Sequence, residues 1–409
     1  MPDARRPTLV LLALAACAPF APAPADRSAL AARAEKGGDD AFQVSVAALS
    51  PEESRRYLGL DLAGRGVQPV WIRIENRTDR PAWYLPIGTD PEYFAPYEVA
   101  YMFHRVLDGK RNRRVDEHLL ATAIPLEVPP RGAAEGFVHT HASQGARHVV
   151  VPLLTDRGTS EYRFVVEVPG GRWDFQRVDF ATLYPAREVR DLDLDGLVAE
   201  LGRLPCCTAD ADGRPRADPL NVVLVGEPPA VVFPFVERGW NFTEPLDPGS
   251  AWRSVKAFLL GSRYVTSPVS PLHLFGRPQD GALQKPRNDI DRRNHLRLWL
   301  APFTFEGRPV WVGQVSRDIG VRFTTHSWYL TTHKIDPDVD EDRDYLLQDL
   351  LMSGNVSRAG YVPGVGAAPR SAPRHNLTGD PYFTDGRRLV LFLEQAERPL
   401  EQVEVFERR

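Results

Sequence analysis

The chain has 409 residues, with 50 Lys and Arg against 54 Asp and Glu, which gives a formal net charge of −4. This balance lacks the basic excess of a nucleic-acid-binding protein, so we expect no nucleic-acid partner. Hydrophobic residues make up 43% of the chain, enough for buried cores. The length predicts two or three domains, at about 150 residues each.

The N-terminus carries the clearest signal for localisation. Arg5 and Arg6 precede a short apolar run that ends at Cys17, directly after Ala15 and Ala16. The run is too short to cross a bilayer as a helix, which takes about 20 residues. A charged start, a short apolar stretch and small residues at the cut are typical of a cleaved signal. The segment 1–17 therefore resembles a bacterial lipoprotein signal peptide with Cys17 as the lipid acceptor, and a signal peptide without lipid is the alternative.

Lipid chains on this cysteine would hold the protein on the periplasmic side of a membrane. In lipoproteins that it resembles, an aspartate after the cysteine favours retention at the inner membrane. Ala18 stands there instead, so the outer membrane is our default expectation. Residues 18–41 begin with alternating Ala and Pro and predict an extended tether. The expected partners are the membrane, through the lipid, and an unidentified envelope ligand or protein.

Residues 42–180 show the period-2 alternation of half-buried strands. Val70, Ile72 and Ile74, for example, fall on one face of a strand. Turn residues rich in Pro and Gly separate six or seven such runs, and one helix is expected around residues 51–58. This pattern predicts an all-β, Ig-like sandwich as the first domain.

Three histidines in this first domain suggest a metal site. If Gln144 and Gly145 form a two-residue hairpin loop, His141 lies opposite His148, and His139 shares their face. Three imidazoles on one face would suit zinc or copper. The alternative is an exposed polar face without a metal. It is favoured because no carboxylate or cysteine completes the ligand set.

The remaining chain predicts a linking helix over residues 181–203, a second domain over 204–394 and a polar tail over 395–409. Helices and strands do not alternate strictly in the second domain, so we expect an α+β fold with a mainly antiparallel sheet. Its expected helices cover residues 250–264 and 336–352. Its expected strands cover residues 219–226, 272–276, 295–303, 309–315 and 388–393.

Cys206 and Cys207 are adjacent, and two states are open to them. Neighbouring Cα atoms lie about 3.8 Å apart, which is shorter than the usual span of a disulfide. Two buried thiols are therefore favoured over a vicinal disulfide.

The second domain resembles the LssY C-terminal domain family. The segments that carry the resemblance lie at residues 219–221, 267–272, 276–280, 284–285, 294–299, 311–318, 332–340 and 382–386. The resemblance implies a link with type I secretion, and in other proteins this domain is attached to membrane-embedded, phosphatase-like or DedA-like segments. A phosphatase activity would belong to those segments, so none is carried over to this chain.

Within that domain, His295, Arg297 and Trp299 alternate with three leucines. A strand places the leucines on one face and a base, a fixed cation and a flat indole on the other. Such a face suits an anionic or sugar-like ligand, since a guanidinium can pair with a carboxylate and an indole can stack. The alternative is a covered face whose side chains form a structural network.

Other side chains suggest an envelope hydrolase, with or without a metal. His333, Asp318 and Asp336 are candidate partners for His295. Asp336 also begins a run of acids that is better explained by helix initiation, with Asp336 as the N-cap. An EF-hand is excluded because the required glycine and glutamate positions do not match. The sequence leaves open whether the protein is an enzyme, which cofactor it uses, if any, and its oligomeric state.

Overall fold

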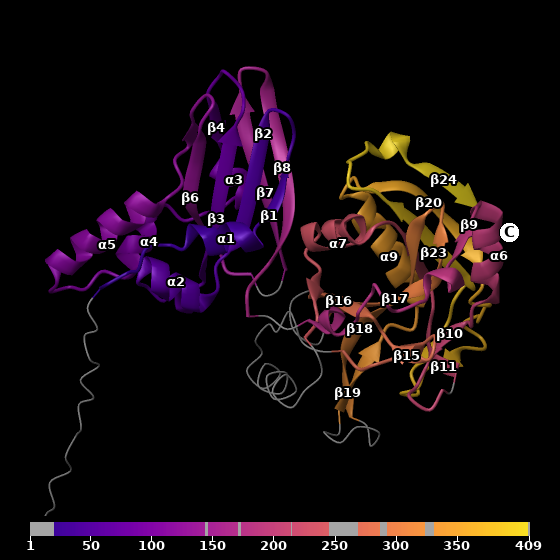
Figure 1. Cartoon of the computed structure of the whole chain (residues 1–409). Helices are drawn as coiled ribbons and strands as arrows, with labels where there is room; N and C mark the ends of the chain where they lie inside the picture. Colours follow the sequence, from indigo (N-terminus) through magenta and orange to yellow (C-terminus); the bar gives the residue numbers. More distant parts are fainter. Residues whose placement is uncertain are drawn as a thin grey trace, which may run out of the picture.

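The computed structural model describes residues 20–143, 146–170, 173–213, 215–244, 269–286, 293–323 and 331–407. The fold is mostly β, with several antiparallel sheets and one large mixed sheet (Figure 1). Cys17 and the expected helix at residues 250–264 lie outside the described residues.

Two four-stranded sheets occupy the N-terminal part of the chain. The first has the order β1 (Glu35–Gly38), β2 (Phe42–Ala48), β3 (Val67–Asn76) and β6 (Ala133–His141). The second has the order β5 (Glu127–Val128), β4 (Ala82–Tyr84), β7 (Ala146–Thr155) and β8 (Gly158–Glu167). Alternate side chains of both sheets share one hydrophobic core, in which Ile72 of β3 and Val151 of β7 are fully buried.

This part of the chain is not all-β, which corrects the sequence prediction. Its helices are α1 (Arg27–Arg33), α2 (Pro51–Leu58), α3 (Pro86–Thr89), α4 (Pro96–Met102) and α5 (Gly109–Thr122), with the short 3-10 turn η1 (Ala63–Arg65). They bury a second core around Trp71 and Leu119. The α2 helix has its predicted bounds, because Ser50 and Glu53 form a reciprocal capping box at its start.

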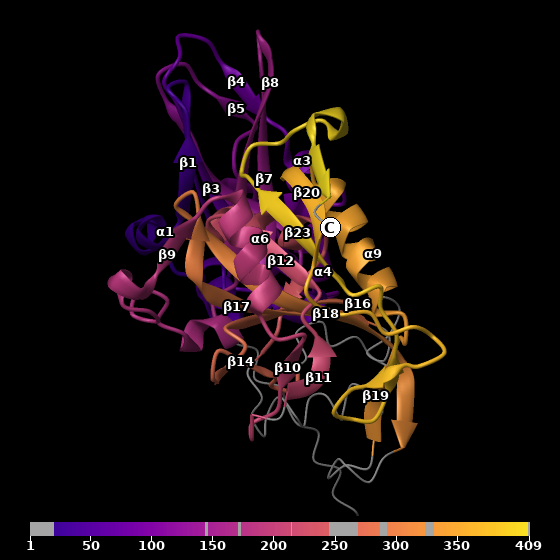
Figure 2. The same cartoon turned by 90° about the vertical axis from the view of Figure 1, so that its right-hand side faces the viewer.

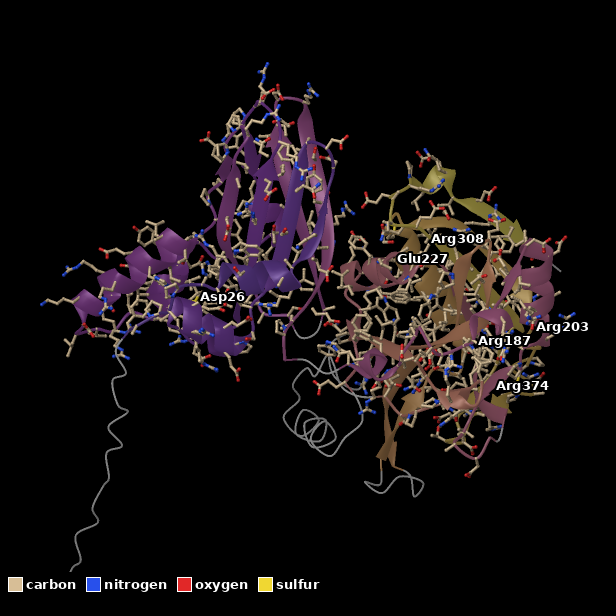
Figure 3. The ribbon with its side chains drawn as sticks, in the orientation of Figure 1. Asp26, Arg187, Arg203, Glu227, Arg308 and Arg374 are labelled. Carbon is tan, nitrogen blue, oxygen red and sulfur yellow. A yellow bond between two sulfur atoms is a disulfide. The ribbon has the colours of Figure 1, made fainter. Side chains whose placement is uncertain are left out.

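The predicted tether over residues 18–41 is also corrected. Phe20 is buried, and Leu30 of α1 is fully buried in the same core. Asp26 caps α1 by accepting a hydrogen bond from the backbone of Ala29 (Figure 3). Strand β1 then pairs with β2. The alternating Ala and Pro at the start of the segment suggested an extended chain. The segment instead packs against the rest of the N-terminal part of the chain because Phe20 and Leu30 are buried in its core.

The C-terminal part of the chain is built on the large mixed sheet. Along its main path the order is β13 (Asn241–Phe242), β16 (Gly281–Pro286), β17 (Arg293–Phe305), β18 (Arg308–Phe323), β12 (Val222–Val225), β23 (Arg387–Leu393), β20 (Val356–Pro363) and β24 (Glu404–Glu407). Two further strands pair at its side, β19 (Thr331–Ile335) with β18 and β9 (Arg190–Leu192) with β17. The β24 strand contradicts the predicted polar tail, because it pairs in parallel with β20.

Smaller elements complete this part. A four-stranded sheet has the order β11 (Pro215–Pro219), β10 (Cys207–Ala209), β14 (His273–Leu274) and β15 (Arg277–Pro278), and β21 (Arg374–His375) pairs with β22 (Pro381–Tyr382). The helices are α6 (Leu194–Arg203), α7 (Pro228–Glu237) and α9 (Val339–Leu351). The 3-10 turns are η2 (Asp174–Arg177), η3 (Ala186–Glu188) and η4 (Leu400–Gln402).

Hydrophobic side chains cover both faces of the large sheet. On one face, Leu224 of β12 and Leu296 of β17 pack with residues of α7 and α9. On the other, Val223 of β12 packs with Leu197 and Leu201 of α6, which lies across the strands in Figure 2. Because strand side chains alternate, consecutive residues of β12 enter different cores.

Two local predictions in this part are wrong. The helix α9 begins after Asp338, whose side chain accepts from the backbone of Glu341, so Asp338 and not Asp336 is the N-cap. Cys206 and Cys207 form a disulfide, with their Cα atoms 3.7 Å apart. The usual Cα–Cα span of a disulfide holds for cysteines that are distant in the chain and does not apply to neighbouring residues.

The two parts of the chain touch along β7, β8 and α7. The ring of His148 on β7 lies 4.8 Å from that of Phe233 on α7. Arg163 of β8 forms ion pairs with Glu237 of α7 and with Glu397. Among the described residues, no helix has both the length and the apolar character needed to cross a bilayer.

Candidate functional site

A hairpin of the large sheet holds the candidate site. Strands β17 and β18 are joined at Glu306 and Gly307, which both have positive φ, as a tight hairpin turn requires. In the resulting register His295 lies opposite Ser316, and Arg297 lies opposite Gln314. Side chains at alternate positions therefore project from the same face of the two strands.

This face carries a buried polar cluster. Leu296 and Leu298 point the other way, into the core beneath α7 and α9. The polar side chains come from four strands of two sheets and are all buried. We call the set the polar cluster, and its members are Asp218, Gln284, Arg293, His295, Arg297, Gln314, Ser316 and Asp318.

His295 and Asp318 are in direct contact, as the sequence hypothesis of partnership required. The Nε2 atom of His295 lies 2.6 Å from Oδ2 of Asp318. Burial lowers the pKa of His295 to about 4, and the opposing attraction of Asp318 does not overcome it. The imidazole is therefore neutral at pH 7. Since an ionised carboxylate only accepts, Nε2 carries the proton and Nδ1 keeps a free lone pair.

Arg297 donates to the neighbouring strand and to the segment that precedes β14. Its Nη1 donates to Oε1 of Gln314 at 2.7 Å, and its Nε donates to the carbonyl of Ser270 at 3.2 Å. Burial lowers the pKa of Arg297, while the charge of Asp218 opposes the shift. Burial in turn raises the pKa of Asp218, which also accepts a hydrogen bond of 3.0 Å from Asn376.

A second arginine lies further along the same face. Arg293 donates to Oε1 of Gln284 at 2.7 Å, and its Nε lies 3.6 Å from Oδ2 of Asp318. The cluster thus holds two guanidinium groups beside the His295–Asp318 pair. Asp218 and Asp318 are the carboxylates of the cluster, and burial raises the pKa of Asp218.

In the part of the chain that the structure describes, Nδ1 of His295, an acceptor, and Nε2 of Gln314, a donor, are buried without a hydrogen-bond partner. Leaving a buried polar atom unsatisfied costs about 1–3 kcal/mol. The two residues are diagonal neighbours across the β17–β18 pair, a placement in which residues are about 7–8 Å apart. A small ligand with an acceptor and a hydroxyl group could satisfy both.

Trp299 shares the face of His295 and Arg297 but not their surroundings. Its ring is fully buried in the hydrophobic core beneath α6, and its Nε1 donates to the carbonyl of Arg277 at 3.4 Å. With both ring faces enclosed by protein, Trp299 supports the fold here, and we leave it out of the candidate binding surface.

The remaining candidates lie around the start of α9. His333 belongs to β19, where its backbone pairs with Val321, and its side chain is outside what the structure describes. The backbone N–H of Asp336 donates to the carbonyl of Arg317, and its Oδ1 accepts from the backbone of Asp338 at 3.0 Å. Asp336 therefore orders the loop that leads into the helix.

The proposed histidine hairpin in the N-terminal part is wrong. Strands β6 and β7 belong to different sheets, so His141 and His148 are not cross-strand neighbours. His141 contacts Asp90 and Phe94, whereas His148 faces α7. Among the described residues, no three His, Cys, Asp or Glu side chains are grouped to hold a metal ion.

Sequence reasoning missed several members of the polar cluster. Gln314 could have been found, because it alternates with Ser316 and Asp318 on a strand that follows β17 after a tight turn. Asp218 gave no local signal, since it comes from a different sheet and meets Arg297 only through the tertiary fold.

Residues 201–387 match the family model described as LssY C-terminus. The match agrees with the resemblance predicted from the sequence motifs, and the matched residues include the whole polar cluster. No curated protein matches the chain.

Proposed function

We propose that this chain is a lipid-anchored protein on the periplasmic side of a bacterial membrane, the outer membrane by default, which binds a small anionic envelope ligand in the polar cluster. The anchor rests on the sequence around Cys17. The binding function rests on one observation: Nδ1 of His295 and Nε2 of Gln314, on diagonal neighbours of the β17–β18 pair, are buried without a hydrogen-bond partner among the described residues. Buried polar groups are otherwise paired, and an unpaired set calls for a ligand or an ordered water.

The same proposal divides the chain into two domains. The N-terminal sheets form an Ig-like sandwich that serves as a spacer or recognition unit, and the LssY C-terminus domain carries the binding site. The N-terminal sheets and one face of the large sheet have separate hydrophobic cores, which supports this division.

The chemistry of the cluster defines the ligand class. Arg293 and Arg297 carry guanidinium groups, with which a carboxylate can form charge-assisted hydrogen bonds. The amide Nε2 of Gln314 can donate to an oxygen of the ligand, and Nδ1 of His295 can accept from a hydroxyl group. A sugar acid carries both groups, whereas a neutral sugar lacks the carboxylate.

Calorimetric titration with N-acetylmuramic acid tests this proposal, with N-acetylglucosamine as the uncharged comparison. We expect only the acid to bind. Gln314→Glu keeps the side-chain shape and the contact with Arg297 but places a negative charge at the ligand, so binding should weaken at least about tenfold. Gln348→Glu on the exposed face of α9 is the matched control. Equal affinity of both variants for the acid, or no binding by the wild type, would contradict the site.

An envelope hydrolase is the second candidate, and the His295–Asp318 contact favours it. Neutral His295 could accept a proton from water at Nδ1 while Asp318 holds the ring, with His333 and Asp336 as the further residues that the sequence suggested. Because the pKa of His295 is about 4, such a base would be active above pH 5 and lose activity as the pH falls through 4.

A panel of p-nitrophenyl esters, phosphates and glycosides tests the hydrolase. Because His295 stays neutral from pH 5 to pH 8, its titration should not change any turnover in this range. The turnover should be lost in His295→Asn. A wild-type protein that hydrolyses none of these substrates, or a variant that retains full activity, would remove this candidate.

A further inference from the structure

The helical hairpin formed by α4 and α5 presents apolar side chains to solvent. Val106 and Leu107, in the turn between the helices, are 100% and 97% exposed. Tyr97 and Tyr101 lie one turn apart on α4 and are also exposed. Exposed apolar side chains that gather on one projecting element mark an interaction surface more often than isolated ones do.

The same turn is strongly basic. Residues 105–114 contain five Arg or Lys and one Asp, so five minus one gives a local charge of +4 in a chain whose net charge is −4. The single acid, Asp108, caps α5 by accepting from the backbone of Arg111. The side chains of Arg105, Lys110 and Arg113 are exposed around the aliphatic pair.

The beginning of the described chain is fixed against α5. The carbonyl of Phe20 accepts a 2.8 Å hydrogen bond from Arg114, and its buried ring lies 5.8 Å from that of His118. Cys17 precedes Phe20 by three residues, which an extended chain covers in about 10 Å. A lipid on Cys17 would therefore emerge next to this helical hairpin.

We propose that the α4–α5 turn contacts the bilayer, with Val106 and Leu107 inserted at the level of anionic headgroups and Arg105, Lys110 and Arg113 against their phosphates. Aliphatic side chains ringed by Lys and Arg are the combination that interfacial membrane-binding segments use. In Figure 1 the hairpin projects at the end of the molecule opposite α6, so this contact leaves the LssY C-terminus domain facing away from the surface. The orientation rests on the proposed lipid anchor, whereas the surface itself can be tested without it.

The test uses the full chain carrying Cys17→Ser, sedimented with vesicles of phosphatidylglycerol and phosphatidylethanolamine or of phosphatidylcholine alone. We expect binding to the anionic vesicles that falls with added salt. A Val106→Ser/Leu107→Ser variant and an Arg105→Gln/Lys110→Gln/Arg113→Gln variant should each bind at least about tenfold more weakly. Val405→Ser is the matched control, because Val405 is 83% exposed on β24. All these chains share one N-terminus, so differences between them report on the hairpin.

Unchanged vesicle binding in both hairpin variants, or no preference for anionic vesicles, would overturn the proposal. The proposal would also be overturned if the hairpin variants bound vesicles as the parent chain does but no longer self-associated in light scattering. That result would assign the surface to a second copy of the chain. The two proposals can be separated. If Cys17→Ser abolishes membrane attachment in cells while the purified hairpin variants bind vesicles as the parent chain does, the lipid anchor is supported and the hairpin contact is contradicted.

Discussion

At the residue scale, burial of His295 in the polar cluster makes the free energy of unfolding depend on pH. Burial lowers the pKa of His295 to about 4 from 6.5, so the unfolded chain binds its proton first as the pH falls. Stability is therefore full above pH 6.5, is lost between pH 6.5 and pH 4, and changes no further below pH 4 on account of this group.

Urea unfolding at pH 7.5 and pH 5 checks this shift. From the two pKa values, His295 should account for about 2 kcal/mol of the stability lost between these pH values. His139 and His148 have lowered pKa values too, so the comparison must be made between variants. His295→Gln should reduce the pH dependence by about that amount, while His375→Gln on the exposed β21 strand should leave it unchanged. An unaltered dependence in His295→Gln would show that the imidazole is not neutral in the folded protein.

The sequence predicted only part of the candidate site. Alternation along the chain placed His295 and Arg297 on one face of a strand, and the structure brings Asp318 against His295. The same argument could not tell that Trp299, four residues on, enters a closed core. A strand pattern fixes the face of a side chain, whereas the elements that cover that face come from distant parts of the sequence.

At the element scale, prediction succeeded where local signals are complete. The Ser50–Glu53 capping box defined α2, because both partners lie within four residues. Strands β17 and β23 were placed within two residues of their observed ends.

The errors at this scale also have physical causes. Helices α4 and α5 were missed because their apolar positions do not follow one buried stripe: only Val115 and Leu119 of α5 are buried, while Val106 and Leu107 in the preceding turn face solvent. The β6–β7 hairpin was wrong because a short connection between two strands is compatible with pairing and also with passage to a second sheet. Local sequence does not distinguish these two outcomes.

At the scale of the whole molecule, three features of the chain belong together in the proposed function. They are the proposed lipid signal at the N-terminus, the basic and apolar helical hairpin beside Phe20, and the buried polar cluster in the residues that match LssY C-terminus. The proposed anchor matters most, because it would determine which ligands and which membrane the protein meets.

Cell fractionation of a Cys17→Ser variant tests that anchor most directly. Membranes are washed in 1 M NaCl, where the Debye length is about 3 Å and electrostatic attachment through the hairpin is screened. We predict that the wild-type protein stays with the membranes, since acyl chains hold it independently of salt, and that Cys17→Ser is released into the wash. Retention of both proteins to the same extent would contradict lipid anchoring at Cys17 and the envelope function built on it.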